Sequence, residues 1–125
     1  MLEHLDSLFT MLTIDTARQL ALSLPEAAEA PHNGRPSFRV RGKIFCVLHP
    51  EDKRAVLKLS EVDQSVFDDY NPSVFHPVEG AWGRQGWTVV ELPKIKKEVF
   101  REALLSAWLQ VAPKSLASKL PDLNV

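Results

Sequence analysis

The feature that most constrains the fold of this chain is a series of three short apolar segments separated by two turn signals. The segments are Ser37–Arg41, Ile44–His49 and Ala55–Leu59, the first of which alternates polar with apolar residues. Gly42-Lys43 has the Gly-X form of a type II′ hairpin turn, and residues 50–53, Pro-Glu-Asp-Lys, give a second turn signal. Strands joined by turns this short pair antiparallel, so the pattern predicts an antiparallel sheet.

Three other segments show the periodicity of amphipathic helices. The first covers about residues 14–24, and the second covers residues 61–69 behind Ser60, which has the character of an N-cap. The third and longest begins at Pro93. Each segment has one apolar stripe, which favours helices that cover one face of the sheet and leave the other face free.

The remaining segments complete the expected order. Residues 25–36 hold three prolines and an Asn-Gly pair, which predict a loop. Val74–Val78 predicts an edge strand because of Pro77, Trp87–Leu92 predicts a further strand, and the glycine-rich residues 80–86 predict a hairpin loop between them. The order α-β-β-β-α-β-β-α therefore predicts an α+β two-layer sandwich, an antiparallel sheet with helices on one face.

Length and composition predict one domain. The chain has 125 residues, of which 45% are apolar and 25% charged, as is typical of a globular domain. We expect residues 13–121 to form this domain and residues 1–12 to form a short amphipathic N-terminal extension. The single cysteine, Cys46, lies in an apolar run and is expected to be buried.

One cysteine allows no disulfide within the chain, which is compatible with a reducing cytosol. The N-terminus has no basic segment of a secretion signal, and no apolar run approaches the roughly 20 residues of a membrane span. We therefore expect a cytoplasmic protein without membrane contact, and we expect it to be a monomer.

Charge is segregated along the chain, although the formal net charge is only −1. Residues 35–58 carry seven cations against two carboxylates, and residues 93–119 carry six against two. Both segments are therefore cationic, and the rest of the chain is acidic.

The sequence also resembles a known family. The stretches LSLPEAAEAPHNGRPSFRVRGKIFCVL, GWTVVEL and SAWLQVAPKSLA resemble the hallmark of the MmcQ/YjbR family, and the resemblance extends over nearly all of residues 11–120. It implies a topology similar to that of secretion chaperones and frataxin-like proteins. It also implies DNA binding through two β-hairpin wings, and it brings no catalytic motif with it.

The cations near the first predicted hairpin are candidates for that binding. Arg39 and Arg41 share one side of their strand, away from the helices, and a turn at Gly42-Lys43 would place Arg39 opposite Cys46. Arginine forks on such a face suit phosphate oxygens. The same pattern also fits a solvated face whose cations discourage edge-to-edge pairing, and both interpretations stay open.

Our leading hypothesis is non-enzymatic binding of duplex DNA by a bacterial-type protein, mainly through phosphate contacts. Lys43 and Arg84 would lie at the tips of the two hairpin wings, and Trp82 would either stack on a base or cover the edge of the core. The alternative is a protein-interaction or chaperone-like module that binds a partner peptide on the open sheet face. The predicted DNA-binding residues are Arg39, Arg41, Lys43, Lys58, Arg84, Lys94, Lys96 and Lys97.

Catalysis and metal binding find little support in the sequence. The four histidines have no ligand-like spacing, one cysteine makes no zinc site, and no nucleophile motif is present. The carboxylates of helix 61–69 are expected to keep that helix soluble rather than to bind iron. We therefore expect no enzyme activity, no metal and no cofactor.

Overall fold

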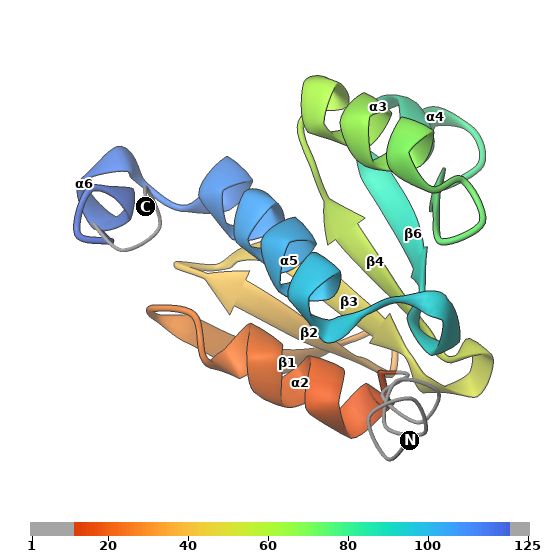
Figure 1. The fold of residues 1–125 in the computed structure, drawn as a ribbon. Coiled ribbons are helices and arrows are strands. Elements are labelled where there is room, and N and C mark those ends of the chain that lie inside the picture. Colours follow the sequence, from red (N-terminus) through yellow and green to blue (C-terminus); the bar gives the residue numbers. More distant parts are fainter. Residues whose placement is uncertain (1–11, 121–125) are drawn as a thin grey trace, which may run out of the picture.

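A computed structural model describes the chain over residues 12–120 (Figure 1). Six strands form one antiparallel sheet in the order β1-β2-β3-β4-β6-β5. The strands are β1 (Ala27–His32), β2 (Arg35–Val40), β3 (Lys43–His49), β4 (Arg54–Lys58), β5 (Phe75–Pro77) and β6 (Trp87–Glu91).

Helices α2 and α5 pack across one side of this sheet (Figure 1). The helices are α2 (Ile14–Leu22), α3 (Glu61–Tyr70), α4 (Ala81–Arg84), α5 (Lys97–Val111) and α6 (Lys114–Ala117), with 3-10 turns at Pro50–Asp52 and Leu92–Lys94. The predicted α+β class, an antiparallel sheet with helices on one face, is confirmed. No helix within the described part of the chain is long and apolar enough to span a membrane.

One strand was not expected. Residues 25–36 were predicted as a loop, but β1 and β2 form a hairpin around Asn33 and Gly34, both of which have positive φ angles, 53° and 78°. This is the geometry of a type I′ turn, for which Asn-Gly is the preferred sequence. Pro31 is tolerated because β1 is an edge strand, where a missing N–H group breaks no ladder.

The next hairpin turns one residue earlier than predicted. Val40 pairs with Lys43, so the turn consists of Arg41 and Gly42, with φ angles of 49° and 84°. It is therefore a type I′ turn rather than the expected type II′ turn at Gly42-Lys43. A β-bulge follows, and Arg39 lies opposite Ile44 instead of Cys46.

Other element boundaries in the structure differ from the predicted ones by a few residues. The final helix begins at Lys97 and not at Pro93, because Leu92–Lys94 forms a separate 3-10 turn. The predicted hairpin loop between β5 and β6 contains the short helix α4. The expected strand before it is confirmed as the edge strand β5, which ends in Pro77.

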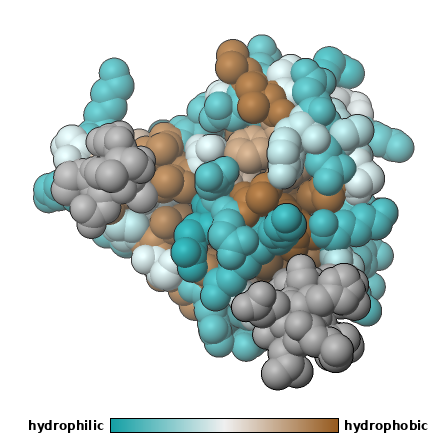
Figure 2. Space-filling view, in the orientation of Figure 1, coloured by the Kyte–Doolittle hydropathy of each residue, from teal (hydrophilic) through white to brown (hydrophobic). Residues whose placement is uncertain are grey.

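Helix α3 lies at the β5 end of the sheet, apart from α5 (Figure 1). Its predicted N-cap is confirmed, because the hydroxyl of Ser60 accepts a hydrogen bond from the Asp63 amide over 3.0 Å. The rings of Phe67 and Phe75 stack at a centroid distance of 4.9 Å and hold α3 against β5. In Figure 2, which shows the helix-covered side, hydrophobic surface stands at the top of the molecule over α3.

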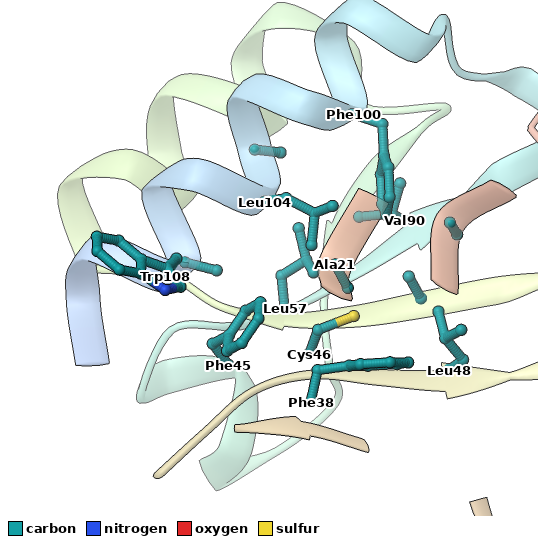
Figure 3. Close-up of a cluster of buried hydrophobic side chains, with 14 of the residues drawn as sticks. Ala21, Phe38, Phe45, Cys46, Leu48, Leu57, Val90, Phe100, Leu104 and Trp108 are labelled. Atoms are coloured by element: carbon teal, nitrogen blue, oxygen red, sulfur yellow. The ribbon is translucent and has the colours of Figure 1, made fainter. Parts of the chain in front are cut away.

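The core lies between the sheet and helices α2 and α5 (Figure 3). Its largest fully buried side chains are those of Trp108, Phe38, Phe45, Phe75 and Phe100. Cys46 is fully buried among them, as predicted, and burial raises the pKa of its thiol far above the ordinary value. Of the expected N-terminal extension only Leu12 lies within the described residues, and it is buried in this core.

Candidate binding face

The face of the sheet that carries no helices, the open face, is built from alternate residues of neighbouring strands. Val47 of β3 lies opposite Val56 of β4, which in turn lies opposite Val89 of β6. Because cross-strand partners share a face, these three valines form one apolar row across the sheet. The row gives the open face a hydrophobic floor.

A hollow of about 520 Å³ lies on this floor. Trp82 of α4 and Trp87 of β6 form an aromatic wall at one end, with their rings in an edge-to-face arrangement at 6.3 Å. Ile44 and Val78 add to the apolar lining. The polar rim of the hollow consists of His32, Asn33, Arg35, His49, Asp52 and Arg54.

Ion pairs organise the polar end of the open face. Glu91 of β6 contacts both Arg54 at 3.0 Å and His76 at 2.8 Å, and its side chain is only 16% exposed. Burial raises the pKa of Glu91, but the hydrogen bonds of His76 and Arg54 outweigh burial, so that this pKa lies below its ordinary value. Glu91 is therefore ionised at neutral pH.

A second ion pair joins Arg35 to Glu51. Nε of Arg35 donates to Oε2 of Glu51 over 2.8 Å, and this hydrogen bond lowers the pKa of the Glu51 carboxyl. Partial burial lowers the pKa of the neighbouring His49, and the positive charge of Arg35 acts in the same direction. His49 is therefore neutral at pH 7 and adds a polar rather than a charged group to the rim.

The first wing does not form a free basic surface. Arg41 lies at the turn, where Nε and one terminal nitrogen donate to the two carboxylate oxygens of Glu26 over 3.1 and 3.2 Å. Nε of Arg39 donates to the hydroxyl of Ser37 over 3.2 Å. Lys43 is exposed, but it pairs with the buried Val40 and so lies on the side of the helices.

The remaining predicted cations divide between two ends of the molecule. Lys58 donates to the backbone oxygen of Gln85, next to Arg84, and its ammonium group lies 5.8 Å from the centre of the Trp87 ring. Lys94 and Lys96 line a small cavity on the helix side instead, and Lys97 begins α5. The eight predicted residues therefore do not form one continuous surface.

One group of side chains among residues 12–120 has the spacing of metal ligands. Atoms of His49, Glu51 and Asp52 lie within 4.8 Å of one another at the rim of the hollow. Glu51 already binds Arg35, so a cation would compete with that ion pair.

A family model described as YjbR matches residues 22–110. The chain belongs to the YjbR family. A similar fold occurs in the crystal structure of the Deinococcus radiodurans protein DR2400, a DUF419 domain, with a TM-score of 0.72 and 20% sequence identity over 89% of each chain. Among curated proteins, none matches the chain.

Sequence reasoning missed the hollow of this YjbR-family chain. Val56 and Val89 belong to strands that are far apart in the sequence, and nothing in their local pattern shows that they are neighbours. The ion pair between Arg54 and Glu91 spans 37 residues for the same reason. A signal was present only in Trp82 and Trp87, two aromatic residues in a glycine-rich segment.

Proposed function

We propose that this YjbR-family chain is a non-catalytic binding protein that holds a partner peptide in the hollow of the open face. The observation that supports this is the hollow itself, whose 520 Å³ falls within the roughly 300–1,000 Å³ of small-ligand pockets. Its valine floor and tryptophan wall suit apolar and aromatic side chains of a peptide.

The charges of the open face also favour a peptide over a nucleic acid. Arg35 and Arg54, the two arginines that line the hollow, bind the carboxylates of Glu51 and Glu91. The face therefore presents apolar surface with a neutralised rim, which offers little attraction to a phosphate backbone. Guanidinium groups in such pairs retain N–H donors that can bond the carbonyl groups of a peptide.

Selection from a displayed library of random peptides tests this proposal. Peptides enriched on the wild-type chain should share apolar or aromatic residues, and Val56→Glu should weaken their binding about tenfold or more, because it places a charge on the floor of the hollow. The matched control is Leu109→Glu on α5, which is 45% exposed and lies outside the hollow. Failure to enrich any peptide, or equal binding by the two variants, argues against the proposal.

Duplex DNA is the second candidate, and one observation favours it. Within residues 12–120 no carboxylate lies within ion-pair distance of Arg39, Lys58 or Arg84. Trp82, which is 61% exposed, belongs to the same short helix as Arg84. These residues support a smaller contact surface than the eight predicted from the sequence.

Salt dependence separates the two candidates. If Arg39, Lys58 and Arg84 each neutralise one phosphate, the affinity for labelled duplex should fall with a log–log slope of about −2.7 against salt concentration. Arg39→Ala with Lys58→Ala should then reduce the slope by about 1.8, whereas Lys97→Ala should leave it unchanged. A flat slope removes DNA as a partner and leaves the peptide proposal in place.

A further inference from the structure

Helix α3 exposes an apolar stripe that no other part of the described chain covers. Val62, Val66 and Tyr70 are 72%, 59% and 66% exposed, and they follow one another at intervals of four residues. Residues at this spacing lie on one face of a helix. Figure 2 shows hydrophobic surface at the top of the molecule, where α3 lies.

The stripe takes no part in attaching α3 to the sheet. Attachment uses another side of the helix, where Phe67 stacks on Phe75 and the Gln64 amide donates to the Gly83 carbonyl over 2.9 Å and to the Thr88 hydroxyl over 3.1 Å. The fold therefore does not require apolar residues on the outer face of α3. Exposed apolar surface of this kind marks contact sites between proteins.

The charges of α3 indicate which kind of partner would bind the stripe. Helix α3 carries four carboxylates and no cation, and these are Glu61, Asp63, Asp68 and Asp69. A second copy of this chain would bring the same acidic residues against each other, which costs free energy. A partner helix with an apolar stripe flanked by lysine or arginine would complement both the apolar stripe and the negative charge of α3.

We propose that the α3 stripe, formed by Val62, Val66 and Tyr70, docks a basic amphipathic helix of a partner protein. The site lies on the helix side of the sheet, so it is independent of the hollow and of the peptide or DNA proposed for the open face. The molecule then has two contact surfaces on opposite sides of one sheet.

Two synthetic helical peptides test the proposal. Both place leucine at the same helical spacing; one has lysine and the other glutamate at the remaining positions. In amide NMR spectra of the full chain, the lysine peptide should shift signals of residues 61–70. Its affinity should exceed that of the glutamate peptide at least tenfold. Signals that shift only around the hollow would overturn the proposal.

Variants test whether the lysine peptide binds the α3 stripe or any exposed apolar surface. Val62→Ser combined with Val66→Ser should lower the affinity for the lysine peptide at least tenfold. Leu109→Ser, at an exposed apolar position of α5, should leave this affinity unchanged. Equal affinity of the two peptides, or no loss in the double variant, would overturn the proposal. Sedimentation that shows a dimer lost in the double variant would also overturn it, because a second copy would then cover α3.

Discussion

The indole N–H of Trp108 donates to the backbone oxygen of Pro25 over 3.0 Å, across 83 residues of sequence. Trp108 is fully buried at the end of α5, and Pro25 lies between α2 and β1. The bond thus fastens the first edge strand to the last long helix. A partly buried carbonyl that loses its donor costs free energy, which makes this contact a test of the fold.

Trp108→Phe should lower the free energy of unfolding by about 1–3 kcal/mol, because it removes this donor and part of the buried ring. Urea denaturation followed by circular dichroism measures the change. Trp82→Phe is the control, since Trp82 is 61% exposed and should change stability little. Equal losses in both variants would show that the Pro25 bond contributes nothing.

Glu91→Gln should lower stability by about 1–2 kcal/mol at pH 7, because Arg54 and His76 lose their common anion. The pKa of Glu91 is depressed in the folded chain. Its contribution to stability is therefore complete above the ordinary pKa of about 4.5 and is lost as pH falls through the folded value. Urea titrations from neutral to acidic pH should show the two proteins converging in acid. A constant difference would contradict the prediction.

Asp68→Asn should stabilise the chain by about 1 kcal/mol at pH 7. Burial raises the pKa of Asp68, and its Oδ1 has no hydrogen-bond partner among the described residues. A raised pKa means that the ionised carboxylate is disfavoured in the fold, so the gain should vanish as pH drops below the ordinary value of 3.8. Thermal unfolding at neutral and acidic pH measures this gain, and Asp69→Asn on the exposed side of α3 serves as the control.

Gly86→Ala should destabilise the chain by about 2–4 kcal/mol. Gly86 has a φ of +99°, and an added Cβ would lie 1.9 Å from the backbone oxygen of Leu59. Gly34→Ala is a matched control, because its φ of +78° is also positive but nothing lies within 4 Å of the added atom. Gly34→Ala should therefore cost only about 1 kcal/mol. Chemical denaturation of both variants separates steric clash from backbone strain.

Local patterns in the sequence predicted those elements whose causes are local. The stripes of α2 and α5 and the cap at Ser60 depend on residues within a turn or two, and the structure has them. The Arg41-Gly42 turn could not be predicted this way, because arginine rarely adopts a positive φ and Gly42-Lys43 offered a commoner turn. Strand β1 was not predicted because it contains Pro31, and proline is compatible with a strand only at an edge.

The candidate site was less predictable than the fold. Alternation placed Arg39 correctly on the side away from the helices, but it could not show that Arg41 meets Glu26 or that Arg54 meets Glu91. These pairs depend on strand order and register, which the sequence does not encode locally. In the first cationic segment, carboxylates neutralise Arg35, Arg41 and Arg54, whereas Arg39 and Lys58 have no carboxylate partner among the described residues.

The two borders of the sheet determine how another molecule can approach it. At one border Pro31 lacks the N–H group that an incoming strand would need, and at the other β5 is three residues long and ends in Pro77. Both borders are therefore poor templates for the addition of a further strand. We therefore expect association to proceed through side chains displayed on the two broad surfaces, where shape and charge select the partner.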